Sequence, residues 1–191
     1  MAYRGMFLKK TKPTEIKEAV WWEEHCIRRQ GGYNFDQSNI PATTKWIPKG
    51  TVLKLTTDGN AAVVKTAEVI EDAASGATAI KVASGSLLKV GDSVDGNDIT
   101  AITVGDSYDT LTVAATTKKI AKGTVVSDYN AKTDTVLGLS YDTFEIEADA
   151  QQMATPTLQV LEVEKDSLPY PVNDDIVAGI NANGVIRFRI Q

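Results

Sequence analysis

Short alternating runs of apolar and polar residues fill the chain from residue 47 onward. The runs are rich in threonine and valine, and turn residues separate them at roughly the 8 to 12-residue spacing of small β folds. Because successive side chains of a strand point to opposite faces, this pattern is typical of a β-sandwich or barrel. We therefore predict a mainly β fold, with strands at residues 51–56, 61–66, 78–83, 93–94, 99–104, 110–114, 124–127, 135–139, 143–147, 157–163 and 185–190.

Three turns between these runs carry residues that tolerate a positive φ angle. They are Asp58-Gly59-Asn60, Asp95-Gly96-Asn97 and Asn183-Gly184. Tight two-residue connections require such residues, so each turn predicts a β-hairpin.

Residues 1–46 differ from the rest and predict either a short N-terminal helix or an extended arm. A helix over residues 14–30 is favoured by Thr14 as N-cap and by Arg28 and Arg29 near its end. Trp21 and Trp22 argue against it, because neighbours on a helix point about 100° apart and cannot share one buried face. Both alternatives remain open at this stage.

We expect residues 47–191 to form the β-rich body, with a small barrel-like insertion at about 78–114. Residues 47–53 (IPKGTVL) are echoed at residues 120–126 (IAKGTVV). The echo indicates either two copies of one β unit or an ordinary turn-to-strand junction used twice.

Charge is distributed unevenly along the chain. Its formal net charge is −5, but residues 1–50 carry nine Lys/Arg and five Asp/Glu, whereas residues 51–191 carry eleven and twenty. Nucleic-acid binding needs clustered basic residues, so an acidic body argues against it. Residues 1–12 hold four basic residues and no acid.

The combinations of catalytic residues that common enzymes use are nearly absent. One cysteine, Cys26, and one histidine, His25, leave little for metal or nucleophile chemistry, and no phosphate-binding glycine loop occurs. Asp92, Asp95 and Asp98 do not match a calcium loop and are interpreted as solvated turn residues. We expect no enzymatic activity, no cofactor and no metal. No apolar run is long enough for a membrane span, and no secretory signal is recognised.

Aromatic residues concentrate in the N-terminal segment, which holds seven of the thirteen. Tryptophan and arginine often anchor protein interfaces. The predicted partner interface consists of Arg4, Phe7, Lys9, Lys10, Trp21, Trp22, Arg28, Arg29 and Trp46. One alternative is that the tryptophans cap the core of the body. Another is a carbohydrate-binding or adhesin module in which Trp21, Trp22 and Trp46 stack on sugar rings.

Several stretches together resemble the decoration, auxiliary and head-fibre proteins of tailed bacteriophage capsids. They are residues 47–53, 76–83, 88–92 and 122–126, so the likeness runs from about residue 47 to 130. The resemblance implies a non-enzymatic structural protein on the outer capsid surface of the virion, often a trimer. Its partners would be the major capsid protein and other virion proteins, with no nucleic acid and no membrane.

The resemblance also implies that residues 1–46 dock on the capsid while the acidic body faces solvent. The chain departs from a long fibre, because it has no collagen-like or coiled-coil shaft and no evident receptor-binding tip. A compact auxiliary protein or a fibre base is favoured. Deleting residues 1–32 is then expected to leave a folded body that no longer binds heads.

Overall fold

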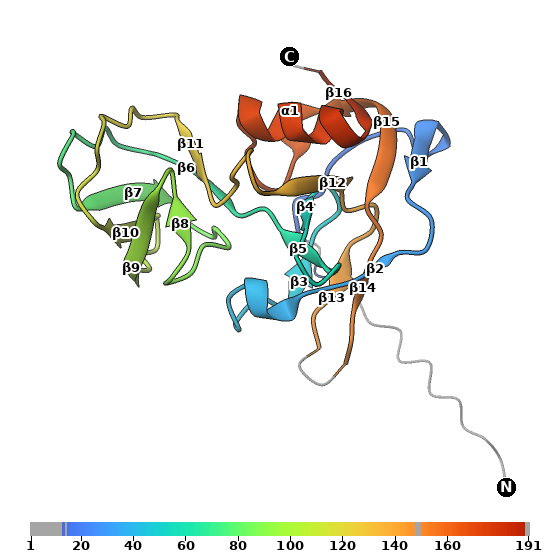
Figure 1. Cartoon of the computed structure of the whole chain (residues 1–191), viewed down its shortest axis with the longest axis horizontal. Helices are drawn as coiled ribbons and strands as arrows, with labels where there is room; N and C mark the ends of the chain where they lie inside the picture. The colour runs from blue at the N-terminus through green and yellow to red at the C-terminus, as the bar shows by residue number, and fades with distance from the viewer. Residues whose placement is uncertain (1–12, 14, 148–149, 190–191) are drawn as a thin grey trace, which may run out of the picture.

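The mainly β fold is confirmed by the computed structural model, which describes residues 13, 15–147 and 150–189. We divide it into a body, residues 15–65 and 128–189, and an insertion lobe, residues 66–127 (Figure 1). The strands of the body are β1 (Cys26–Arg28), β2 (Tyr33–Asn34), β3 (Trp46–Ile47), β4 (Val52–Leu55), β5 (Ala61–Val63), β12 (Thr135–Leu139), β13 (Phe144–Glu145), β14 (Met153–Ala154), β15 (Thr157–Glu164) and β16 (Val185–Arg189). The strands of the insertion lobe are β6 (Thr66–Glu68), β7 (Ala79–Ala83), β8 (Ser93–Val94), β9 (Asn97–Thr103), β10 (Tyr108–Val113) and β11 (Val125–Ser127). The helices are α1 (Asp174–Asn183) and the 3-10 turns η1 (Glu23–His25), η2 (Gln37–Asn39) and η3 (Lys165–Ser167).

The body is built from small sheets around two hydrophobic cores. One sheet has the order β1-β15-β16 and another has the order β12-β4-β5, while β3 pairs with β13 and β2 pairs with β14. Helix α1 lies over β12 and β16 and buries Ile176 and Ile180 in the first core. The second core is centred on Phe35, whose ring meets that of Phe144 edge to face at 5.1 Å.

The insertion lobe has a hydrophobic core of its own. A four-stranded sheet of order β7-β10-β9-β8 and the β11-β6 pair enclose Ile80, Val82, Leu111 and their neighbours. The core begins at Ala67 and ends at Val126, so the packed unit is longer than the 78–114 segment expected. Figure 1 shows it beside the body, joined through β6 and β11.

The echo between residues 47–53 and 120–126 is reproduced in the backbone. Gly50 and Gly123 both have positive φ angles, of 90° and 83°. The following residues, Thr51 and Thr124, donate their N–H to the carbonyls of Pro48 and Ala121 at 3.2 and 3.1 Å. The strands that follow, β4 and β11, have different partners, so the likeness is confined to the turn and the strand it starts.

The helix predicted over residues 14–30 is wrong for the part of that range that the structure describes. Only the short turn η1 and strand β1 occur there. Trp21 is buried, with 7% of its surface exposed, whereas Trp22 is 74% exposed. In an extended chain, adjacent side chains point to opposite sides, so Trp21 can be buried while Trp22 is exposed. On a helix the two side chains would point only about 100° apart.

The boundary expected near residue 46 does not coincide with a boundary in packing. Ala19 and Trp21 belong to the first core of the body, and β1 pairs with β15. The Ala19 N–H donates to the Lys49 carbonyl at 3.0 Å, and a side chain at Gly50 would clash with Ala19. Deleting residues 1–32 would therefore remove part of the body, which corrects the expectation that the remainder stays folded.

Helix α1 was not predicted. The signals for it were an N-cap at Asn173, two acids in the first turn, and Ile176 and Ile180 four residues apart. Asn183-Gly184, expected to form a hairpin, ends this helix instead, and β16 then runs parallel to β15. A parallel pair needs a crossover connection, and the helix supplies it.

Replacing Asn173 by alanine is expected to lower the free energy of unfolding by about 1 kcal/mol. The Asn173 side chain accepts a hydrogen bond from the Ile176 N–H at 2.9 Å, and alanine leaves that donor without its cap. Chemical denaturation measures the change. Asn173→Ser keeps a capping oxygen and should retain most of the stability; an Asn173→Ala protein as stable as the unmodified chain would contradict the capping role.

A buried ion network fixes the insertion lobe to the body. Lys65, with 2% of its side chain exposed, pairs through its ammonium with Asp92 of the insertion lobe and lies 3.6 Å from the Asp128 carboxylate. The same ammonium donates to the carbonyl of Asn39 at 2.9 Å. The network thus joins residues far apart in sequence, and Asp92 is an ion-pair partner rather than the solvated turn residue that was expected.

Lys54 extends this network on the body side. Its ammonium lies 2.9 Å from Asp134 and 3.4 Å from Asp128. Burial alone would lower the pKa of Lys54, but the two carboxylates outweigh it and raise that pKa. Burial raises the pKa of Asp128, against the opposing effect of the two lysines. The buried Asp128 carboxylate is tolerated at the junction because the ammonium groups of Lys54 and Lys65 lie close to it.

Candidate functional site

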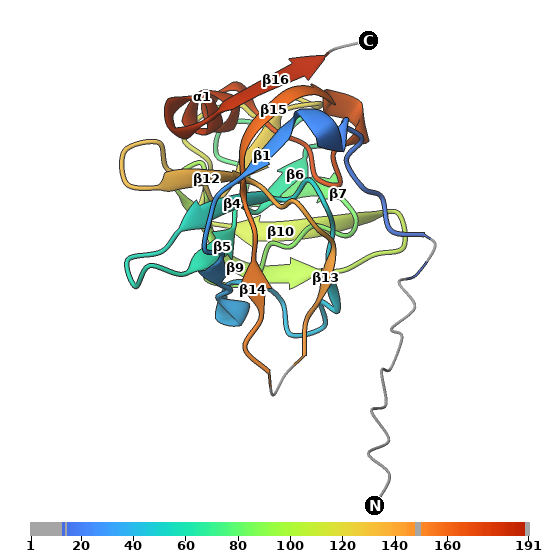
Figure 2. The ribbon, with the colours of Figure 1, turned by 90° about the vertical axis from the view of Figure 1, so that its right-hand side faces the viewer.

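An exposed apolar surface covers the outer side of the β1-β15-β16 sheet, which faces the viewer in Figure 2. We call it the Trp22 face and define it by five large exposed hydrophobic residues: Val20, Trp22, Ile27, Leu161 and Val185. Scattered single apolar residues are normal on a protein surface, whereas a group of them on one sheet is a candidate interaction site.

Strand register places Ile27 and Val185 on the same side of the sheet. Ile27 lies opposite Gln159, and Gln159 lies opposite Val185, so the three form one row across the sheet. The next row, Cys26, Val160 and Ile186, points to the core. Because side chains alternate, the buried row places the other row outside.

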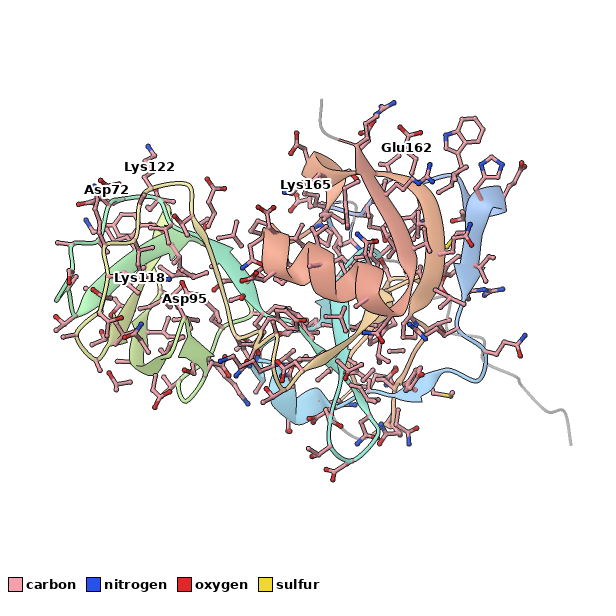
Figure 3. The ribbon with its side chains drawn as sticks, turned by 45° about the horizontal axis from the view of Figure 1, so that its top comes forward. Asp72, Asp95, Lys118, Lys122, Glu162 and Lys165 are labelled. Atoms are coloured by element: carbon pink, nitrogen blue, oxygen red, sulfur yellow. The ribbon has the colours of Figure 1, made fainter. Side chains whose placement is uncertain are left out.

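Leu161 reaches the surface through an irregularity in β15. The pairing of β15 with β16 shifts between Val160 and Val163, and both of these valines stay buried. The two residues between them, Leu161 and Glu162, are therefore both exposed, and Figure 3 shows Glu162 on the outward side of the strand. Extra residues at such a bulge commonly re-aim a side chain.

Two hollows flank Trp22. The larger, about 270 Å³, is lined by Trp22, His25, Leu161 and Glu162. The smaller, about 70 Å³, lies where Val20, Trp21 and Trp22 meet Glu162, Glu164 and Arg189. A protruding indole between two hollows can insert into a partner while the partner fills the hollows.

The buried Trp21 indole adds a polar feature to this region. Its Nε1 has no hydrogen-bond acceptor among the residues that the structure describes, although the ring is covered by the Lys49 ammonium at 4.4 Å. A buried donor without an acceptor is unfavourable. The smaller hollow has Trp21 in its lining, but the Nε1 atom itself is buried.

Charged residues surround the apolar surface. The Arg189 guanidinium pairs with Glu164 at 2.7 Å and with Glu162 at 3.5 Å. On the other side, Lys49 pairs with Glu23 at 2.8 Å, and this contact lowers the pKa of the Glu23 carboxyl. An apolar centre inside a polar rim is the usual anatomy of a protein interface.

The predicted interface residues do not form one surface. Trp22 and Arg28 are exposed, and the Arg28 guanidinium stacks over the Tyr141 ring at 4.6 Å. Trp21 is a core residue, which corrects its assignment to the interface and agrees with the alternative that tryptophans cap the core.

Arg29 and Trp46 make contacts within the body. The Arg29 guanidinium donates to the carbonyl of Leu137 at 2.6 Å and to that of Asn183. Trp46 is half-buried in β3, opposite Glu145 of β13. The remaining four predicted residues, Arg4, Phe7, Lys9 and Lys10, lie outside the described residues.

Ile27, Leu161 and Val185 were missed from sequence because Ile27 fell in the helix expected over residues 14–30, and Leu161 and Val185 were counted as ordinary strand residues. The available signal was the run of residues 157–163, where two leucines interrupt strict alternation. A bulge makes such residues surface residues, but the sequence does not show which strand partners impose it.

The side chains that could act in catalysis or bind a metal are not arranged for either role in the part of the chain that the structure describes. Burial raises the pKa of the Cys26 thiol to about 11, so the thiolate is scarce at neutral pH. The Asp72 carboxylate pairs with Lys119 at 2.7 Å, which lowers its pKa. Within residues 15–147 and 150–189, no group of three or more metal-ligating side chains comes together. In the same residues, no helix has the length and apolar character needed to cross a membrane.

The chain has no match in three comparisons: with protein-family models, with curated proteins and with solved structures.

Proposed function

We propose that this protein is a non-enzymatic structural component of a bacteriophage virion that attaches to the capsid through the Trp22 face and the basic residues 1–12. The observation that carries the proposal is the exposure of Trp22 beside Leu161 and Val20, at two hollows of the surface. Tryptophan is enriched at protein interfaces and among the residues that contribute most to binding.

The two attachment elements are adjacent in the chain. The described N-terminal segment passes Val20 and Trp22 and enters β1, so residues 1–12 precede the Trp22 face directly. Their four basic residues supply charge that steers association, while the apolar face supplies contact area. The partner expected from this pairing is the major capsid protein, presenting an acidic and partly apolar surface.

The acidic residues 51–191, which include the insertion lobe and most of the body, suit an outward position on the virion. Residues 51–191 carry a formal charge of −9, from eleven basic and twenty acidic residues. Like charge on the outward surfaces of separate particles keeps those particles apart. We place the protein on the outer capsid surface, as a homo-oligomer in which a trimer fits the symmetry of a head.

The alternative carbohydrate-binding module depended on three tryptophans stacking on sugars. Trp21 is buried and Trp46 is half-buried, so only Trp22 presents its ring fully. A lone tryptophan among aliphatic side chains matches a protein partner better than a sugar.

Removing residues 1–12 is expected to weaken binding to isolated phage heads about tenfold at low salt, because four positive charges are lost. The difference should shrink as salt increases, since screening already weakens the unmodified protein. Cosedimentation across a salt series measures both effects.

Replacing Arg4, Lys9, Lys10 and Lys12 by glutamine in the full chain separates charge from length. This variant should behave like the truncated protein. Equal binding of the truncated and unmodified proteins at low salt would remove residues 1–12 from the docking assignment.

A further inference from the structure

The junction between the insertion lobe and the body holds a lysine directly against an aspartate, both shielded from water. The Lys65 side chain is 2% exposed, and its Nζ contacts Oδ1 of Asp92, whose side chain is 9% exposed. The two residues are 27 positions apart in the sequence and belong to different parts of the molecule. The fold therefore brings a primary amine beside a carboxyl carbon at a site with little water.

Packed cores hold the two backbones on either side of this contact. Val64, directly before Lys65, belongs to the first core of the body. Leu88 and Val94, close to Asp92 in sequence, belong to the core of the insertion lobe. Because neither core can shift without losing packing, the amine and the carboxyl group stay together, and fixed proximity of this kind greatly raises the rate of a reaction between two groups.

The Asp92 carboxylate is oriented by the backbone. Its Oδ2 accepts a hydrogen bond from the Lys89 N–H at 2.7 Å, while its Oδ1 meets the Lys65 Nζ. A backbone N–H donor at a carboxyl oxygen stabilises the negative charge that develops there when a nucleophile adds to the carbon. The arrangement is that of a carboxyl group prepared for attack.

Lys65 is fixed at both ends of its side chain. Its Nζ donates to the carbonyl of Asn39 at 2.9 Å, and its backbone N–H donates to Oδ1 of Asp128 at 2.8 Å. A free lysine side chain has many rotamers, and restricting them before a reaction removes an entropic part of the barrier. The nucleophile is thus held in place as well as its target.

Asp128 supplies a second carboxylate next to the amine. Its Oδ2 lies 3.6 Å from the Lys65 Nζ, and its side chain is 8% exposed. Burial raises the pKa of Asp128, against the opposing effect of Lys54 and Lys65. A carboxyl group with a raised pKa accepts and returns protons more readily near neutral pH, and the distances of such groups often shorten as a reaction proceeds.

The buried charges also provide a driving force. Taking an ammonium group and a carboxylate out of water is costly, and their mutual attraction offsets that cost only in part. Joining Lys65 to Asp92 replaces both charges by a neutral amide. Asp128 then keeps the Lys54 ammonium, 3.4 Å away, as its partner. No carboxylate of the network is left without a cation.

We propose that Lys65 and Asp92 form an isopeptide bond that ties the insertion lobe to the body, with Asp128 carrying the proton. The Asp128 carboxylate takes one proton from the Lys65 ammonium, and the neutral amine adds to Cγ of Asp92, forming the N–C bond. One C–O bond of the Asp92 carboxyl group then breaks. Two of the three ammonium hydrogens leave with that oxygen as one water molecule, and the third stays on the amide.

Nothing is oxidised or reduced in this step, so no co-reactant is needed. The ion pair in the structure is the state from which the bond forms. The inference does not depend on capsid attachment, and its test requires no phage particle.

The test is a peptide map of the purified full chain, unfolded in denaturant, digested with trypsin and measured by mass spectrometry. Trypsin cleaves after lysine and arginine, so the bond joins the peptide of residues 55–81 to that of residues 90–118. We expect this linked product from most molecules, with no cleavage after Lys65 and a mass one water molecule below that of its two parts.

Two variants identify the groups involved. Lys65→Arg keeps a buried cation but has no primary amine, so the linked product should disappear. Asp128→Asn keeps the size of the side chain but cannot take up the proton, and it should leave the product in a small minority of molecules. Lys119→Met, which removes the exposed partner of Asp72, is the matched control and should form the bond fully. Circular dichroism checks that each variant is folded.

Absence of the linked product from the folded, unmodified chain would overturn the inference, because Lys65 and Asp92 would then form an ion pair only. A loss of water that maps to Asp58-Gly59 or Asp95-Gly96 instead would have the same meaning, since an aspartate before glycine can cyclise onto the next backbone nitrogen. Full linkage in folded Asp128→Asn would overturn the role of Asp128 in proton transfer.

Discussion

Replacing Lys65 by methionine is expected to lower the free energy of unfolding by about 3 to 5 kcal/mol. The substitution keeps the length of the side chain but removes the cation that pairs with Asp92 and lies 3.6 Å from Asp128. Both carboxylates then stay in the junction between lobe and body with less compensation. Lys54 remains near Asp128, which limits the loss. Chemical denaturation of both proteins measures the difference.

The destabilisation caused by Lys65→Met should depend on pH in a defined direction. Burial already raises the pKa of Asp128 in the folded protein, and removing Lys65 raises it further. A carboxyl whose folded pKa exceeds its unfolded value costs stability at neutral pH, and this cost disappears as pH falls below the unfolded pKa. The difference between variant and unmodified protein should therefore shrink as the pH is lowered towards 4, near the ordinary carboxyl pKa of about 4.

Lys81→Met is the matched control. Lys81 pairs with Glu71 at 2.7 Å on the surface of the insertion lobe, where both side chains are exposed to water. Exposed ion pairs contribute little, so the expected loss is below about 1 kcal/mol. Similar losses for the two variants, or a loss at Lys65 that does not vary with pH, would contradict a buried network that holds the insertion lobe.

Replacing Trp22 by alanine is expected to weaken binding to phage heads by about 30-fold or more, with little effect on stability. The side chain is 74% exposed, so its truncation removes little packing from the folded chain. At the centre of an interface, however, loss of a tryptophan commonly costs about 2 kcal/mol or more, which corresponds to roughly 30-fold in affinity.

Tyr108→Ala provides the control for Trp22→Ala. Tyr108 is also an exposed aromatic residue, but it lies on β10 of the insertion lobe. It should bind heads normally if attachment uses the Trp22 face. If Trp22→Ala binds as tightly as the unmodified protein, or if Tyr108→Ala is the weaker binder, the face has been assigned wrongly.

Much of the β structure could be predicted because its signals are local. Each of the eleven predicted strand ranges overlaps a strand, and the turns at Asp58-Gly59-Asn60 and Asp95-Gly96-Asn97 connect the hairpins β4-β5 and β8-β9. Alternation and turn residues are properties of neighbouring positions. Strands and turns can therefore be predicted from these properties without knowing the partner strand.

The errors occur where tertiary contacts decide the local structure. Residues 15–30 have acceptable helix-capping signals, but Trp21 is buried in the first core beside β15. Burial of this side chain stabilises the extended conformation more than capping stabilises a short helix. Asn183-Gly184 has the composition of a hairpin turn, yet it ends helix α1, which was not predicted. In both places a short motif admits two structures, and packing selects one.

The candidate sites could be predicted only in part. Trp22 stands out in the sequence, but its identical neighbour Trp21 is a core residue, and no local pattern separates the two. The Lys65 network joins Asp92 of the insertion lobe to Lys65 and Asp128 of the body, and the register of β6 with β11 places Lys65 beside Asp128. Such register is a long-range property, so these features become visible only in the folded chain.

The most direct test of the attachment proposal is cosedimentation of the full chain with isolated heads of the bacteriophage whose virion it is proposed to join. We predict saturable binding that stops at a fixed number of copies per head, with Trp22→Ala left mostly in the supernatant. A protein that stays in the supernatant at every concentration and salt condition would contradict capsid attachment.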